Sequence, residues 1–515
     1  MYDLPENKEK FKKLQGNLKD LLHNEKDLGE GDLDILVVPS FSIDQEVGSN
    51  VLGFLHYEER LLFSLIRLRN PRTRLIYVTA QPLPNIVIDY YLELLSGIPF
   101  GHARERLLML YLYDNSLKPL TQKILERPRL MARIKSTLRP GKSYMVCYNS
   151  TALEAELSLA LDIPLLGCDP DLLYWGSKSG SREIFHDCKI PHPAGSLQVK
   201  NVPDLVEQIK KLQEQKPSLE RMVIKLNEGV SGEGNAILSL DPDDNKDTDW
   251  QKSLENLKFQ AVSESWNHFA RKIEELGAIV EEYIEGSLKR SPSVQGYISP
   301  NGEVEIVSTH DQILGGPDGQ VYLGCTFPAD QSYREQLRDH GLKIGQALAA
   351  KGAIERFGVD FVAVWSQQKQ QWDLYAVEIN LRKGGTTHPF MTLQLLTNGK
   401  YDNSNGLFYS PYGQEKYYFS TDNLCKPQYG GMLPTDLMDI IAKHRVHFDS
   451  GLLEGTVFHL MGALSEFGKL GLTCIGNSHQ QAQEIYAQIE SILDQETSSE
   501  PHHGALYSPV SWYVR

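Results

Sequence analysis

The sequence predicts a multidomain protein in which an open α/β domain precedes a mixed α+β module. A chain of 515 residues is too long for one ordinary hydrophobic core, so two or three domains are expected. Near the N-terminus, two short apolar runs flank a stretch with helical periodicity, which is the pattern of a βαβ unit. From about Ile190 the pattern changes to helices mixed with strands that are joined by turns.

Composition and charge narrow the classes of protein. The hydrophobic fraction of 41% and the charged fraction of 23% are typical of a globular chain. A formal charge of −15, with no local basic patch, disfavours nucleic acid and anionic membranes as partners. No apolar run approaches the ~20 residues of a membrane helix, the first residues lack a signal-peptide core, and the six cysteines form no CxxC pair. We therefore expect a cytoplasmic protein.

The α/β domain is predicted to cover residues 1–170. Its first strands are expected in the apolar runs that begin at Leu33 and Arg74, with a helix from about Val51 to Arg69 between them. Two later strands, in SYMVCYNST and IPLLGCDP, bracket another helix. The intervening residues 103–139 are predicted to be helices broken by prolines.

The α+β part is predicted to divide at residues 288 and 430. Residues 171–288 would hold the helix VPDLVEQIKKLQEQ and the strands MVIKLNEG and GAIVEEYIEG, with an acidic loop, DPDDNKDTDWQ, between the strands. Residues 289–430 would hold the strands SPSVQGYI and EVEIVSTHDQIL, a helix from about Ser332 to Lys351 and two more strands. Residues 396–431 give no confident assignment. Residues 431–515 would add two strands near Phe467 and a final helix.

A polar stripe on one of these strands predicts a metal and phosphate site. In AVEINLRKGGTTHP, alternation places Glu378, Asn380 and Arg382 on one face of the strand. A carboxylate and an amide oxygen two residues apart can bind one Mg²⁺, and a guanidinium can hold a phosphoryl group. GVDFVAVW supplies Asp360 on a neighbouring strand. The alternative is a core strand with ordinary edge polarity.

A second stretch, MVIKLNEGVSGEGNAIL, predicts contact with phosphate. Lys225 lies in an apolar strand, and the loop that follows contains Gly229, Gly232 and Gly234, whose backbone N–H groups can surround an anion. Lys178 could reach the same phosphates from the opposite side. A plain hairpin with surface lysines remains an alternative, because neither a Walker loop nor a dinucleotide fingerprint is present.

The order of these elements resembles the ATP-grasp superfamily from about Leu165 to Thr392. More narrowly, the segments YEERLLFSLIRLRNP, RLIYVTAQPLPNIVIDYYLELL, STHDQ, GCTFPAD and EINLRKGGTTHP look like those of pheganomycin-type peptide ligases, over nearly the whole chain. The resemblance implies an ATP-grasp fold preceded by a pre-ATP-grasp α/β domain. The implied activity is that of an ATP-dependent carbon–nitrogen ligase, which joins a small carboxylate such as an amino acid or peptide to an amine through an acylphosphate. A non-catalytic ATP-binding regulator and an ATP-grasp phosphotransferase stay open as alternatives, and a homodimer is common among such proteins.

The resemblance also implies roles for individual residues. Arg382 and Lys225 would stabilise the transferring phosphate as catalytic groups, with ATP and Mg²⁺ as cofactors. Many members have a ribose-binding acid two residues after the hinge glycine, where this chain has Leu288 and then Lys289, so Glu281 or Glu285 would take that contact. The ATP contacts would be Lys178, Lys225, Gly229, Ser231, Gly232, Gly234, Glu281, Glu282, Tyr283 and Ile284, and the Mg²⁺ ligands Asp360, Glu378 and Asn380.

The substrate site is harder to place. Some candidates lie at the end of the strand that contains STHDQ, and others follow the strand that carries Glu378 and Asn380. Glu58 and Arg60, on the helix predicted between the first two strands, are further candidates. The main candidates are Gln295, His310, Asp311, Gln312, Gly384, Gly385, Thr386, Thr387 and His388.

Overall fold

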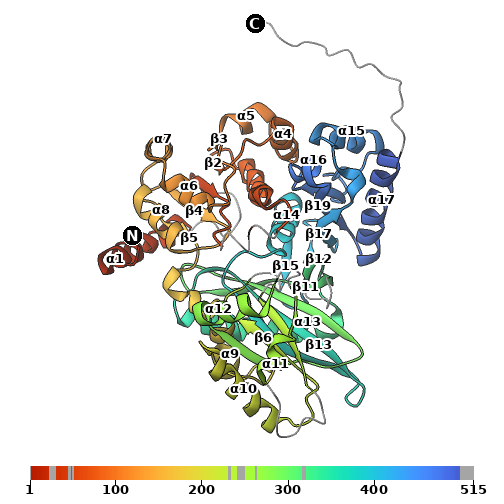
Figure 1. Ribbon diagram of the computed structural model, residues 1–515. Helices are drawn as coiled ribbons and strands as arrows, with labels where there is room; N and C mark the ends of the chain where they lie inside the picture. The colour runs from red at the N-terminus through yellow and green to blue at the C-terminus, as the bar shows by residue number, and fades with distance from the viewer. Residues whose placement is uncertain are drawn as a thin grey trace.

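The structure is a computed structural model that describes residues 2–22, 31–43, 48, 51–229, 234–240, 250–260, 264–315 and 321–498. In this part of the chain three main sheets, of five, four and eight strands, are accompanied by a two-stranded hairpin. Figure 1 shows the N-terminal elements and the C-terminal elements side by side, above the green strands and helices of the middle of the chain.

The N-terminal sheet is parallel, in the order β3-β2-β1-β4-β5, which confirms the predicted open α/β arrangement. Apolar residues on both faces of its central strands are buried under helices, as in other parallel sheets. The strands are β1 (Asp34–Val38), β2 (Arg74–Thr79), β3 (Leu107–Tyr111), β4 (Ser143–Cys147) and β5 (Leu165–Leu166). The helices are α1 (Pro5–Gly16), α2 (Leu18–Leu21), α4 (Asn85–Glu93), α5 (Phe100–Glu105), α6 (Leu120–Leu125), α7 (Pro128–Thr137) and α8 (Ala152–Leu161).

Two features of this domain differ from the prediction. The expected helix after β1 is a 3₁₀ helix, η1 (Phe54–Arg69). The segment predicted to be entirely helical contains the strand β3, because the apolar run LLMLY pairs with β2 and extends the sheet. A run of five apolar residues has no decisive period, so its partner determined its conformation.

The four-stranded sheet is antiparallel, in the order β8-β7-β6-β9. Its strands are β6 (Arg221–Leu226), β7 (Asn235–Ser239), β8 (Lys258–Phe259) and β9 (Ala278–Glu282). The predicted helix 202–215 is confirmed residue for residue as α10 (Val202–Gln215), while most of the predicted acidic loop lies outside the described residues. The other helices are η2 (Pro170–Gly176), α9 (Lys178–Asp187), α11 (Trp250–Glu255) and α12 (Trp266–Leu276).

The eight-stranded sheet is antiparallel, in the order β14-β13-β10-β11-β12-β17-β19-β18. Helix α13 (Gln331–Ala350) packs against β10 and β11 through Leu337, Ile344 and Leu348. The strands are β10 (Lys289–Ile298), β11 (Val304–Gly315), β12 (Val321–Phe327), β13 (Glu355–Ser366), β14 (Gln371–Asn380), β17 (Tyr417–Cys425), β18 (Gly455–His459) and β19 (Lys469–Gly476).

This sheet crosses the boundary that the sequence places at residue 430. Strand β17 precedes that boundary and pairs with β12 on one side and with β19, which follows the boundary, on the other. The segment left unassigned from the sequence, residues 396–431, forms β15 (Lys400–Asp402), β16 (Leu407–Tyr409), β17 and η3 (Pro427–Tyr429). The remaining helices are α14 (Thr387–Thr397), α15 (Pro434–His444), α16 (Ala463–Phe467) and α17 (His479–Ser498). No described helix combines the length and the apolar composition that crossing a bilayer requires.

Candidate active site

A cavity of about 740 Å³ lies where the three sheets meet. Residues of the four-stranded sheet, the eight-stranded sheet and the N-terminal domain all line it, and no single segment of the chain could form it alone. Most of the residues singled out from the sequence belong to this lining: Lys178, Lys225, Glu281, Glu282, Tyr283, Ile284, Gln295, Asp311, Gln312, Asp360, Glu378, Asn380, Arg382, Gly384, Gly385 and Thr386.

The predicted metal-binding residues lie together on β13 and β14. Asp360 is directly opposite Glu378 in the strand register, and the amide of Asn380 donates to Asp360 Oδ2 at 3.0 Å. Gln312 of β11 donates to the other oxygen of Asp360 at 2.5 Å. Burial and the charge of Glu378 raise the pKa of Asp360 to about 6. Two carboxylates and an amide oxygen in this arrangement fit a hard divalent cation such as Mg²⁺, which would offset the repulsion that raises this pKa.

Lys178 joins the metal-binding residues to the start of α9. Its ammonium group forms an ion pair with Glu378, and only 7% of the residue is exposed. The end of β6 positions this helix, because Asn227 Oδ1 accepts from Ser179 N at 3.0 Å and from Ser179 Oγ at 2.6 Å. Ser181 of α9 in turn accepts from Ile379 N in β14 at 3.0 Å. Lys178 is therefore held between the two sheets, within reach of a ligand in the cavity.

Lys225 on β6 belongs to a buried ion-pair network that the sequence reading did not include. Glu281 on β9 accepts from Lys225 Nζ at 2.6 Å and from Arg182 Nη1 at 2.6 Å. Burial alone would raise the pKa of Glu281, but the two cations outweigh burial and lower it. Glu281 therefore stays ionised and orients Lys225, a contact different from the ribose contact that the resemblance implied.

Three of the predicted ATP contacts, Glu282, Tyr283 and Ile284, line the cavity at the last residue of β9 and just after it. Glu282 N donates to Ala194 O at 2.8 Å, and its side chain accepts from Ala194 N at 2.7 Å and pairs with Lys216. The Tyr283 ring lies between two cations, with Arg221 at 3.9 Å and Lys289 at 4.3 Å from its centroid. These contacts fix the course of the segment past the cavity.

Only part of the predicted glycine loop can be placed. Gly229 and Gly234 bound the loop, and Gly234 has φ of +85°, a conformation that glycine adopts without strain. Ser231 and Gly232 lie outside the described residues. The phosphate-covering role of this loop therefore stays a prediction.

The substrate candidates divide into two groups. Gln295, Asp311, Gln312, Gly384, Gly385 and Thr386 line the cavity. Gly385 lies so close to Tyr322 that a Cβ there would be 2.6 Å from the ring, which explains the need for glycine at this point.

His310, Thr387 and His388 are not among the cavity-lining residues, and the structure corrects this part of the prediction. His310 is fully buried and shares a 2.7 Å hydrogen bond with the Tyr418 hydroxyl, because its position on β11 faces the core. Thr387 Oγ1 accepts from Gly384 N at 2.9 Å and so closes the loop that leads into α14. His388, in the first turn of that helix, is buried and contacts Asp422 and His459.

Comparison with known proteins identifies the family of the chain. A family model of IQCH-like ATP-grasp domains matches residues 172–251 and 245–404, and a model of the PGM1 C-terminal domain matches residues 436–489. The L-propargylglycine–L-glutamate ligase of Streptantibioticus cattleyicolor is 30% identical over 450 residues, which cover 85% of this chain and 90% of that protein. The chain belongs to the ATP-grasp superfamily.

More distant similarities extend the comparison. The IQ motif-containing protein H of Danio rerio is 23% identical over 92% of this chain and 49% of its own length, so the chain spans about half of that protein. Two solved biotin carboxylases share the fold at 13% identity. The biotin carboxylase domain of the 2-oxoglutarate carboxylase from Hydrogenobacter thermophilus has a TM-score of 0.55 with 88% of each chain covered, and the Campylobacter jejuni enzyme has 0.53 with 90% covered.

The N-terminal domain contributes more to this ATP-grasp cavity than the sequence reading predicted. Arg60 of η1 lines it together with Tyr57 and Tyr148. The Arg60 guanidinium lies 4.2 Å from the Tyr57 ring centroid and donates to the Tyr148 hydroxyl at 3.1 Å. The sequence indicated Arg60 as a substrate candidate through its position in the YEER segment. Arg182 had none, because its role depends on Glu281, 99 positions away.

Proposed function

We propose that the protein, an ATP-dependent carboxylate–amine ligase, binds ATP and Mg²⁺ in this cavity and activates the carboxylate of an amino acid or peptide for attack by an amine. The observation that supports this most strongly is the meeting of opposite charges in one cavity. Asp360, Glu378 and Asn380 form a cation site on one wall, while Lys178 and Lys225 project from other elements toward the same space.

The chemistry follows from the weakness of a carboxylate as an electrophile. Phosphorylation by ATP converts the poor oxide leaving group into phosphate, and the acylphosphate can then be attacked by an amine with release of phosphate. A bound Mg²⁺ supplies charge neutralisation at the β- and γ-phosphates. Lys225 and Arg382 would stabilise the negative charge that spreads over the transferring group, at about 3 to 4 kcal/mol for each well-placed donor.

Amino acids are the substrate class that we propose. The relative named above is a ligase of L-propargylglycine and L-glutamate, both amino acids. Besides Arg382, two arginines, Arg60 and Arg290, line this cavity and could hold the α-carboxylate of an amino acid. The homodimer expected from the resemblance stays a prediction, which sedimentation of the purified protein would check.

The test measures product and nucleotide together. The protein is incubated with ATP, Mg²⁺ and pools of amino acids and dipeptides, and condensation products that have lost one water are sought by mass spectrometry. We expect release of ADP and phosphate that depends on both a carboxylate and an amine. Nucleotide binding without this release would favour a regulator, and a stable phosphorylated product without an amide would favour a phosphotransferase.

A further inference from the structure

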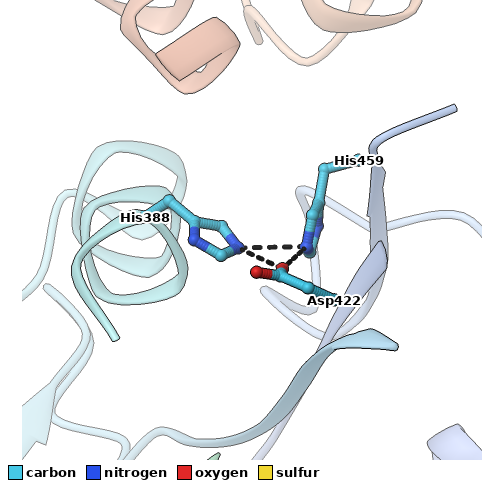
Figure 2. Close-up of side chains that lie close together, drawn as sticks. All are labelled: His388, Asp422 and His459. Atoms are coloured by element: carbon cyan, nitrogen blue, oxygen red, sulfur yellow. Dashed lines mark hydrogen bonds and ion pairs between the residues drawn. The ribbon is translucent and has the colours of Figure 1, made fainter. Parts of the chain in front are cut away.

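Outside the cavity lining, three buried side chains direct one donor atom each toward a common point (Figure 2). They are His388 of α14, Asp422 of β17 and His459 of β18, and their exposed fractions are 5%, 1% and 4%. The cation site proposed for Mg²⁺ uses other residues, on β13 and β14. The three residues therefore form a separate cluster.

The distances define a closed triangle of the same three atoms. His388 Nε2 is 3.0 Å from His459 Nε2, His459 Nε2 is 2.8 Å from Asp422 Oδ1, and His388 Nε2 is 3.4 Å from that oxygen. A chain of hydrogen bonds cannot satisfy all three edges. If both Nε2 atoms carry protons, two N–H groups oppose each other. If only one of them does, the lone pair of the other Nε2 atom faces a carboxylate oxygen.

We propose that His388, Asp422 and His459 bind a divalent first-row transition metal, of which Zn²⁺ is the representative probe. Two imidazoles and one carboxylate form a common ligand set for such ions. An ion placed roughly 1 Å above the plane of the three atoms would lie about 2.0 to 2.1 Å from each, which is the usual Zn–N and Zn–O distance. The fourth position would be open to water.

The surroundings favour the protonation states that metal binding needs. Burial lowers the pKa of His388 well below its usual value, so this imidazole is neutral at pH 7. Burial would raise the pKa of Asp422, but the positive charge of the Arg60 guanidinium beside it outweighs burial and lowers this pKa strongly. Asp422 is therefore an ionised ligand.

Arg60 provides the outer contact of the ligand set. It forms an ion pair with Asp422 Oδ2, the oxygen that faces away from the triangle, as outer groups do with metal-ligating carboxylates. Arg60 also lines the active-site cavity. The metal would hold α14, β17 and β18 together next to the cavity wall. It would also fix the carboxylate of Asp422, which orients Arg60. The proposed role of the metal is therefore structural.

The first measurement is the metal content of the native protein. Full-length protein without a histidine tag is purified without chelators, dialysed, and analysed by inductively coupled plasma mass spectrometry, which distinguishes zinc from iron, cobalt, nickel and copper. We expect about one transition-metal ion per chain. The metal-stripped protein should regain one equivalent of Zn²⁺ and, with Co²⁺, show the visible absorption of a tetrahedral N/O site.

Variants locate the ion. His388→Gln and His459→Gln should each reduce the bound metal at least tenfold, while His310→Gln, which changes a buried histidine outside the cluster, should retain it. Circular dichroism checks that each variant is folded. If a variant is not folded, the metal content and the Zn²⁺ uptake of the native protein decide whether the site binds metal. Less than a tenth of an equivalent in the native protein, together with no uptake of Zn²⁺ or Co²⁺, would overturn the proposal and leave a hydrogen-bonded network. Full retention of the metal in both folded cluster variants would also overturn it. Neither result decides whether the protein binds ATP or acts as a ligase, which the condensation assay tests separately.

Discussion

At the scale of single residues, the cavity is organised by cations that already face carboxylates. Lys178 pairs with Glu378, and both Lys225 and Arg182 pair with Glu281. Binding of a nucleotide phosphate would therefore compete with these pairs or add to them, and binding of a cation at Glu378 would free Lys178 for phosphate. Nucleotide and metal binding should be coupled through this lysine.

Arg382 is predicted to affect the rate of phosphoryl transfer more than the affinity for ATP. It lines the cavity just beyond the metal strand, and its charge lowers the pKa of Asp360 against the larger effect of burial. Arg382→Ala should lower kcat by two or more decades, because it removes a donor to the transferring phosphoryl group, while the Kd of ATP should change little. Steady-state kinetics and calorimetry measure these quantities, and Arg382→Lys should recover part of the loss. Unchanged turnover would remove Arg382 from the mechanism.

Glu281 makes a different prediction, on stability. Its carboxylate is 2% exposed and serves two cations, so Glu281→Gln would leave Arg182 and Lys225 without their buried counter-charge. We expect the free energy of unfolding to fall by about 3 to 5 kcal/mol, and ATP to raise the melting temperature of the variant more than that of the wild type, because phosphate would replace the lost charge.

Glu285→Gln is the matched control for this change. Glu285 pairs with Arg221 on the surface, where the side chains are 44% and 36% exposed, so its loss should cost about 1 kcal/mol or less. Urea unfolding compares the two variants. Equal losses would show that the buried network does not stabilise the fold more than a surface pair.

At the scale of elements, the sequence predicted those whose pattern is local. Helix α10 has strong amphipathic periodicity and a capping asparagine, Asn201, and its limits were predicted correctly. The face of β14 that bears Glu378 and Asn380 followed from alternation alone, and Arg382, two residues beyond the end of the strand, lines the same cavity. Strands β3 and β17 were missed because their conformation depends on pairing with β2 and with β12 and β19. The cluster of His388, Asp422 and His459 joins residues up to 71 positions apart and had no local signal either.

The packing of α13 on the large sheet can be tested through a glycine. A Cβ at Gly345 would be 2.6 Å from both Phe357 and Val304. Glycine to alanine in a helix ordinarily adds about 0.5 to 1 kcal/mol of stability, but overpacking at this contact should cost about 1 to 3 kcal/mol. Gly345→Ala should therefore lower the free energy of unfolding measured in urea.

Gly101→Ala gives the opposite expectation for the same chemical change. Gly101 lies in helix α5, and a Cβ there would meet no atom within 4 Å. The free energy of unfolding of the Gly101→Ala variant should equal that of the wild type or exceed it by up to about 1 kcal/mol. A stabilised Gly345→Ala protein would mean that the helix moves away from the sheet easily.

At the scale of the whole molecule, the C-terminal residues complete the large sheet and pack against the N-terminal domain. Strand β19 pairs with β17, and C-terminal segments contact the N-terminal domain: Phe458 N donates to the Tyr90 hydroxyl at 3.0 Å, and Gly462 N donates to Glu59 at 3.1 Å. In Figure 1 the blue C-terminal elements lie beside the red and orange N-terminal ones. One apolar core contains residues of both segments, such as Leu62 and Leu472. This arrangement argues that the predicted boundary at residue 430 does not separate units that fold independently.

Truncation tests this dependence. A chain that ends at residue 430 would lose β18 and β19, leave the edge of β17 unpaired and expose apolar residues that Leu470, Leu472 and Ile475 now cover, so it should aggregate or fail to bind ATP. A chain that ends at residue 498 keeps every described contact and should match the full chain in melting temperature and ATP affinity. Size-exclusion chromatography with light scattering and thermal shift with ATP measure both. If the shorter chain were monodisperse, unfolded cooperatively and bound ATP, strands β10 to β14 would form a stable nucleotide site without the C-terminal strands, and the boundary at residue 430 would separate units that fold independently.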